Sequence, residues 1–178
     1  MIARHRLELA LPGASIGAAA GAMAGGLTLL AGRPTGVAAL SALLLAAPLA
    51  LAGGLYGVLL GRVFRPGTFG PAGLYWMAAF PPARLLQESV TGLGMSDGVP
   101  AFLLYQAMVA LGFAIGFVWT HERLMPHWLL RRAGHNPYAA ELLDLYLRYA
   151  ATVRGRTGPR GGKAVRGRTR ARGGKGAG

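Results

Sequence analysis

The sequence predicts an all-α integral membrane protein: a bundle of transmembrane helices, then a cytoplasmic amphipathic helix and a disordered basic tail. Of its 178 residues, 53% are hydrophobic and 14% are charged, against about 25% charged in a typical soluble domain. The basic residues gather late in the chain: 13 of the 19 Lys and Arg lie at or after Arg123, and no acid follows Asp144. The absence of Cys excludes a disulfide-stabilised secreted domain and any thiolate metal site.

Three stretches within the first 121 residues are free of charge and long enough to cross a bilayer. A helix of about 24 residues is about 36 Å long, whereas the hydrocarbon core is about 30 Å thick. Backbone in lipid must satisfy its own hydrogen bonds, which favours helices. We therefore expect spans at about 11–32, 37–60 and 99–120. The first stretch stays apolar through Leu30, which favours a span over a cleaved signal peptide.

The stretch at about 68–94 is apolar and aromatic but rich in proline, so we expect a broken fourth span or a re-entrant segment. An interior proline removes a backbone hydrogen bond and clashes with the preceding turn. Four segments place both termini on one side of the membrane, and three place them on opposite sides. The excess of Lys and Arg on the cytoplasmic side favours four, with Arg33 outside and Arg84 within or near the outer end of this segment.

This interpretation divides the chain into three parts. Residues 1–121 form the transmembrane bundle, 122–151 a juxtamembrane amphipathic region and 152–178 the basic tail. The tail is cytoplasmic in either topology, and four segments also place the N-terminus in the cytoplasm. Arg outnumbers Lys 17 to 2, which suits a GC-rich bacterial coding bias. We therefore expect a multi-pass protein of a bacterial inner (plasma) membrane.

Glycines recur every four residues in each of the three spans, which places them on one face of each helix. Without side chains on that face, another backbone can approach closely, and such packing is a main source of helix association in lipid. The first interpretation is packing within the bundle. The alternative is that at least one of these faces docks another subunit or a second copy. The glycines are Gly13, Gly17, Gly21 and Gly25, then Gly53, Gly57 and Gly61, and finally Gly112 and Gly116.

Few polar groups lie within the predicted spans, which disfavours an ion-coupled transporter. The exception is Arg84, which lies four residues before Glu88, so the two side chains share a helix face and can pair. Two interpretations stay open for this pair. It is either an interfacial Arg that reaches toward the headgroups with a surface partner, or a buried pair at a functional or subunit contact.

Motifs for catalysis or metal binding are weak. His121-Glu122 begins like a zinc-protease helix, but Met125 occupies the place of the second histidine. The spacing of His121, His127 and His135 does not suit helical metal ligands, so we expect them at the interface or in solvent. No Walker-type loop and no convincing Ser/His/acid set stands in the sequence. We expect no catalytic residue, no metal and no cofactor.

Asn136 and Pro137 predict the start of a helix at about 137–151, because Asn is a preferred N-cap and Pro a preferred first helical residue. Apolar residues fall along one face of this helix, and Asp144 and Arg148 can pair on the other. The helix is therefore amphipathic and is expected to lie on the membrane surface or to dock on a protein partner.

The tail holds a repeat of period 12, in which Val153–Lys163 recurs as Val165–Lys175 with nine of eleven positions identical. Such Arg/Gly composition cannot bury a core and predicts disorder. Each basic residue adds about 1 kcal/mol of attraction to an anionic leaflet, so we expect membrane lipids as a partner. Nucleic acid is the weaker alternative, because no aromatic residue follows Tyr149 to stack on bases. The basic residues are Arg154, Arg156, Arg160, Lys163, Arg166, Arg168, Arg170, Arg172 and Lys175.

The leading functional hypothesis is a small non-catalytic accessory or scaffold subunit of a membrane complex, docking through its glycine faces and its cytoplasmic helix. One alternative is a homo-oligomeric channel or small transporter whose glycine faces pack protomers around a pore. A second is a membrane-tethered nucleic-acid or ribosome binder that uses the basic tail.

Overall fold

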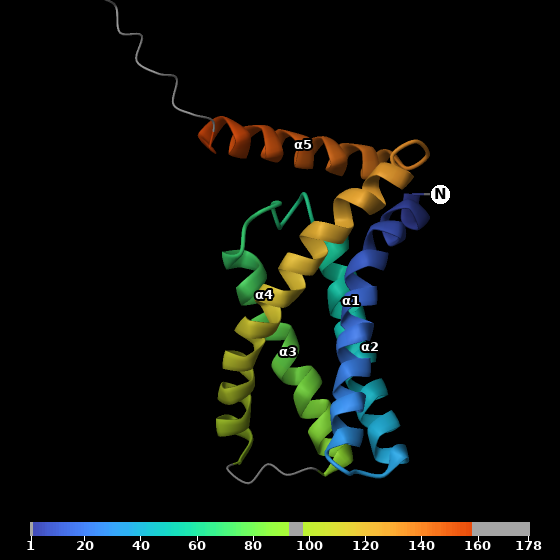
Figure 1. Cartoon of the computed structure of the whole chain (residues 1–178), viewed down its shortest axis with the longest axis vertical. Coiled ribbons are helices and arrows are strands. Elements are labelled where there is room, and N and C mark those ends of the chain that lie inside the picture. Colours follow the sequence, from blue (N-terminus) through green and yellow to red (C-terminus); the bar gives the residue numbers. More distant parts are fainter. Residues whose placement is uncertain (1, 93–97, 158–178) are drawn as a thin grey trace, which may run out of the picture.

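The computed structural model describes residues 2–92 and 98–157, and this part of the chain is all-helical (Figure 1). The predicted all-α class is therefore confirmed. The expected end of the last helix at about 151 is wrong for the first residues of the predicted tail, because 152–157 continue α5; the rest of the expected disordered tail, 158–178, lies outside the described residues. Within them five helices follow one another: α1 (Ile2–Leu30), α2 (Thr35–Leu59), α3 (Gly70–Thr91), α4 (Gly98–Arg132) and α5 (Pro137–Thr157).

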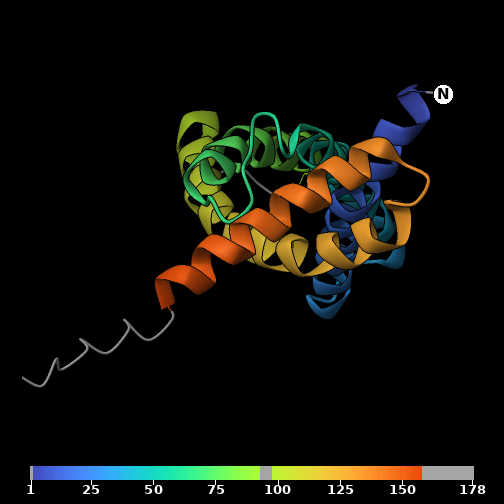
Figure 2. The same cartoon turned by 90° about the horizontal axis from the view of Figure 1, so that it is seen from above.

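The first four helices run alternately up and down the long axis of the molecule (Figure 1). The start of α1, segment 60–69 and α5 lie at one end, which we call the α5 end. The α1–α2 turn and the end of α3 lie at the other, which we call the turn end. α1 packs along α2 and α3 packs against α4. α5 runs across the α5 end of the bundle (Figures 1 and 2).

Three of the described helices are long and apolar enough to cross a membrane: Arg4–Leu30 within α1, Thr35–Leu59 and Gly98–Arg132. They correspond to the three expected spans, although two of them are longer than expected. α1 begins well before residue 11, and α4 continues past residue 120 as far as Arg132. At about 1.5 Å per residue, α4 is about 52 Å long, so it extends well beyond a hydrocarbon core of about 30 Å.

The fourth segment differs from the expected broken stretch, because α3 is one continuous helix. Pro71 lies in its first turn, where no backbone partner is lost. Pro81 and Pro82 lie inside the helix, and each removes one hydrogen bond without ending it. Pro81 is itself buried against the bundle, and such tertiary contacts hold this stretch in place. α3 ends at Gly92, whose left-handed backbone lets its N–H donate to the Glu88 carbonyl.

The core of the bundle is aromatic where α2, α3 and α4 meet. The rings of Trp76 and Phe117 lie 4.5 Å apart between centroids, and Tyr56 meets Phe117 edge-on at 5.2 Å. Phe64, from segment 60–69, stacks on Tyr56 at 4.6 Å. All four side chains are buried. Within a bilayer such rings stabilise the bundle through close contact with one another, by about 0.5–1.5 kcal/mol for each aromatic pair. This cluster holds segment 60–69 against the bundle and so fixes the surface on which α5 packs.

Candidate functional site

The glycines of the first two spans are used inside the chain, where α1 and α2 pack backbone to backbone. A Cβ added at Gly13 would collide with the carbonyl of Gly53, and one at Gly17 with the carbonyl of Leu49. The same holds further along the pair, with Gly21 against Ala46, Gly25 against Ala42 and Gly57 against Leu9. These faces are therefore occupied by the opposite helix of the same chain.

The remaining glycines of the prediction have other surroundings. Gly61 has a left-handed backbone with a φ of 87°, and an added Cβ would lie 3.1 Å from Leu142 of α5. Gly112 and Gly116 of α4 would have no heavy atom within 4 Å of an added Cβ. The structure therefore places these last two on an open face, unlike the glycines of α1 and α2.

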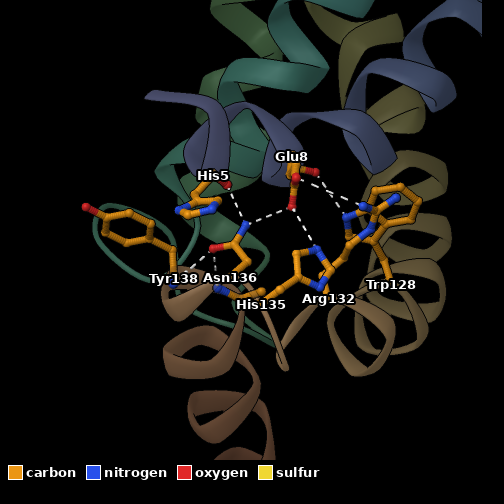
Figure 3. Close-up of polar contacts among 8 residues, drawn as sticks. His5, Glu8, Trp128, Arg132, His135, Asn136 and Tyr138 are labelled. Atoms are coloured by element: carbon orange, nitrogen blue, oxygen red, sulfur yellow. Dashed lines mark hydrogen bonds and ion pairs between the residues drawn. The ribbon is translucent and has the colours of Figure 1, made fainter. Parts of the chain in front are cut away.

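A set of polar contacts joins the start of α1 to the turn between α4 and α5, residues 133–136, which we call the elbow (Figure 3). Asn136 is at its centre and is fully buried. Its Oδ1 accepts hydrogen bonds from the backbone N–H groups of Tyr138 and Ala139, at 3.1 and 3.2 Å, which caps α5 as the sequence predicts. Its Nδ2 donates to the Glu8 carboxylate at 3.0 Å and to the His5 carbonyl at 2.7 Å. The side-chain amide of Asn136 therefore caps the N-terminus of α5 and also binds the start of α1.

Glu8 receives further contacts from α4 and the elbow. Its backbone carbonyl accepts a hydrogen bond from Trp128 Nε1 at 3.0 Å. Its carboxylate lies 3.7 Å from His135 Nε2 and 4.0 Å from Arg132 Nη1. We call Glu8, Trp128, Arg132, His135 and Asn136 the clasp. Because it joins three elements, the clasp fixes the direction in which α5 leaves the bundle.

The inner face of α5 is buried on the α5 end of the bundle. Ala139, Leu142 and Tyr146 lie on this face at helical spacing. Burial and, secondarily, the negative charge of Glu122 raise the pKa of the Tyr146 phenol well above its ordinary value, so Tyr146 stays neutral. Glu122 in turn accepts a hydrogen bond from the Gly67 N–H at 3.3 Å. This face holds α5 down on segment 60–69.

The outer face of α5 is exposed and mixed in chemistry. Asp144 and Arg148 form the expected ion pair, and the Asp144 carboxylate raises the pKa of the Arg148 guanidinium. Glu141 is also exposed, and Leu147 is 60% exposed beside these charges. The outer face of α5 therefore presents charges of both signs and one exposed apolar side chain.

A large groove opens along the side of the bundle, with walls from α1 to α4 and a volume of about 1070 Å³. Most of its wall is apolar. Met23 and Leu27 of the wall are 69% and 62% exposed, so the groove is open laterally. Gly112 and Gly116 both lie on its α4 wall. Because the groove lies along α1 and α4, it faces the hydrocarbon of any membrane that these helices cross.

The pair predicted between Arg84 and Glu88 is present and lies in the wall of this groove. Arg84 Nη2 is 2.7 Å from Glu88 Oε1, and Arg84 Nη1 donates to Gln87 Oε1. The Glu88 side chain is 7% exposed and that of Arg84 is 22% exposed. Glu88 Oε2 is buried without a hydrogen-bond partner among the described residues. Arg33, from the α1–α2 turn, lines the same groove.

The expectation that His121 faces the interface or solvent is wrong, because its side chain is fully buried. The imidazole stacks on Phe117 and meets Tyr56 edge-on, with ring centroids 5.5 and 5.2 Å apart. Both of its nitrogens lack a hydrogen-bond partner among the described residues. His127 and His135 are exposed, as expected.

Most of the basic tail residues lie outside the part of the chain that the structure describes. Of the nine basic tail residues, Arg154 lies in the last turns of α5, the side chain of Arg156 is not described, and the other seven lie outside the described residues. The lipid and nucleic-acid hypotheses for the tail therefore stay predictions.

In the part of the chain that the structure describes, no three His, Asp or Glu side chains gather as metal ligands.

The fold indicates a general class of protein but no particular family. Three apolar helices of membrane-spanning length support a helical membrane protein. No protein-family model, no curated protein and no solved structure matches this chain.

Proposed function

We propose that the protein is a non-catalytic accessory or scaffold subunit of a membrane complex, and that α5 is its docking element for a cytoplasmic partner domain. The observation that carries the proposal is the clasp, which holds α5 across the bundle with its outer face exposed. A helix that only anchored the chain to a surface would not need a buried Asn joining it to α1.

The packing of the glycines supports this choice of docking element. The sequence offers glycine faces and the cytoplasmic helix as docking surfaces, but α1 and α2 use their glycine faces on each other. Two of these surfaces stay uncovered among the described residues: the α4 face at Gly112 and Gly116, and the outer face of α5, where Leu147 and the Asp144–Arg148 pair are exposed together. Only the second lies outside the helices of membrane-spanning length, where a cytoplasmic domain can reach it. Val153, near the end of α5, is also partly exposed, at 41%.

The distribution of charge supports a cytoplasmic location for α5. Basic residues of α1, of segment 60–69 and of the α4–α5 elbow all lie at the α5 end, whereas Arg33 lies at the turn end. Lys and Arg are enriched on the cytoplasmic side of membrane proteins. We therefore place the N-terminus and the tail in the cytoplasm of a bacterium, with the bundle in its inner (plasma) membrane.

Site-specific photo-crosslinking in the native host tests the docking role. A photoreactive amino acid at Leu147 should give one discrete adduct with another protein, because this side chain projects from the outer face of α5. The matched control is the same amino acid at Leu130 of α4, a similarly exposed apolar site outside α5. Absence of an adduct at Leu147, or the same adduct at both sites, would contradict docking through α5. An adduct with a second copy of this chain would favour the homo-oligomeric channel or transporter.

A further inference from the structure

The lateral groove carries an inference that is independent of α5. We propose that it binds one phospholipid whose headgroup carries both a phosphate and a primary ammonium, with an acyl chain lying along Gly112 and Gly116. The polar end of the groove lies toward the turn end of the bundle, so the headgroup lies in the leaflet at that end. In the orientation proposed above, on which this one assignment rests, that is the outer leaflet.

The apolar part of the groove fits a hydrocarbon chain. Its volume of about 1070 Å³ is slightly above the roughly 300–1,000 Å³ usual for small-molecule sites. The groove opens sideways between α1 and α4, where Met23 and Leu27 are exposed. Gly112 and Gly116 leave the α4 wall without side chains, and no described side chain fills the space in front of them. A chain from the surrounding bilayer can therefore enter without crossing a polar barrier.

The polar end of the groove shows which headgroup fits. Arg84 and Arg33 supply two positive charges, and the Glu88 carboxylate supplies one negative charge. An arginine guanidinium has five donors, and the described contacts of Arg84 use only part of this set. A phosphate at this end would accept hydrogen bonds from the two arginines.

Glu88 distinguishes between phospholipids. Its Oε1 is paired with Arg84, whereas its Oε2 is buried and unpartnered, at a side chain that is 7% exposed. A buried carboxylate oxygen without a donor is costly. A primary ammonium can donate to it, whereas the quaternary ammonium of a choline headgroup has no N–H and a glycerol headgroup has no positive charge. The site therefore favours an ethanolamine headgroup over both.

The test uses the full-length protein in mild detergent and three lipids with identical acyl chains: phosphatidylethanolamine, phosphatidylcholine and phosphatidylglycerol. Native mass spectrometry measures the occupancy of the first bound lipid. Phosphatidylethanolamine should bind on the order of tenfold more tightly than either competitor, as expected for one additional hydrogen bond to a charged group. Equal binding of the three lipids by the unaltered protein would overturn the proposal without any variant.

Two variants locate the site. Glu88→Gln should remove the preference for ethanolamine over choline, because it removes the negative charge that the ammonium needs. Gly112→Phe should remove tight binding altogether, because the ring fills the groove. The matched control is Gly26→Phe, since an added Cβ at Gly26 also meets nothing within 4 Å but Gly26 is not part of the groove wall. Retained preference in Glu88→Gln, or equal loss in Gly26→Phe and Gly112→Phe, would contradict this site.

Discussion

Asn136 donates a hydrogen bond to the Glu8 carboxylate at 3.0 Å while its side-chain oxygen caps α5. The two residues are 128 positions apart in the chain. The same amide therefore determines where α5 begins and ties that beginning to α1. This contact and the buried inner face of α5 together hold the helix on the bundle, which supports the docking role proposed for it.

Replacing Asn136 should destabilise the protein. Asn136→Ala removes the cap, worth about 0.5–2 kcal/mol, and leaves the Glu8 carboxylate without its best donor. We expect a loss of about 2–3 kcal/mol in the free energy of unfolding, measured by denaturant titration in detergent.

Asn136→Asp separates the two roles of this residue. It keeps the cap acceptor but places a second carboxylate beside Glu8. The double variant Glu8→Gln with Asn136→Asp restores a donor and an acceptor, so it should recover much of the stability that Asn136→Asp loses. Equal stability of Asn136→Asp and the unaltered protein would show that the clasp contributes nothing.

Gly17→Ala should disturb the α1–α2 pair. The new methyl group would overlap the Leu49 carbonyl, and backbone cannot move aside as a flexible side chain can. Overpacking of this kind costs about 1–3 kcal/mol. Gly26→Ala is the control: its methyl group would meet nothing within 4 Å, and helix propensity favours it by up to about 1 kcal/mol. The melting temperatures of the two variants should therefore shift in opposite directions.

His121→Leu should stabilise the bundle, by about 1 kcal/mol. The substitution removes two buried nitrogens that have no partner while nearly keeping the side-chain volume. His127→Leu serves as the control, because His127 is exposed and its effect should stay within about 0.5 kcal/mol. A marked loss of stability in His121→Leu would show that the imidazole has a bonding partner in the membrane.

The spans could be predicted because lack of charge over a long stretch is a property of the sequence itself. The cap at Asn136 could be predicted for the same reason, since it depends on adjacent residues. The environment of a glycine could not: Gly17 and Gly112 belong to the same spacing pattern, yet one is enclosed by Leu49 and the other faces an open groove. The spacing of the glycines shows that one helix face lacks side chains. Only the arrangement of the helices shows whether another helix covers that face.

The continuity of α3 and the burial of His121 were missed for a related reason. The cost of a proline in a helix is local, but the packing around Pro81 that offsets it is tertiary. An imidazole is compatible with solvent and with an aromatic core, and its sequence neighbours do not distinguish the two. The Glu8 clasp gives no local signal, because its partners lie more than a hundred residues away.

Cysteine labelling tests the orientation, since the chain has no Cys of its own. Gly36 and Gly134 lie near opposite ends of the bundle, and an added Cβ at either meets nothing within 4 Å. In intact spheroplasts an impermeant maleimide should label Gly36→Cys at once and Gly134→Cys only after lysis. The reverse pattern would contradict a cytoplasmic α5, and labelling of both before lysis would contradict two ends separated by a membrane.

The accessory-subunit role is tested most directly by the native mass and composition of the complex extracted from its own membrane in mild detergent. We predict a heteromeric assembly of fixed stoichiometry, from which an Asp substitution at Leu147 releases the other subunits while the bundle stays folded. A monomer, or an assembly that contains this chain alone, would contradict the accessory-subunit role.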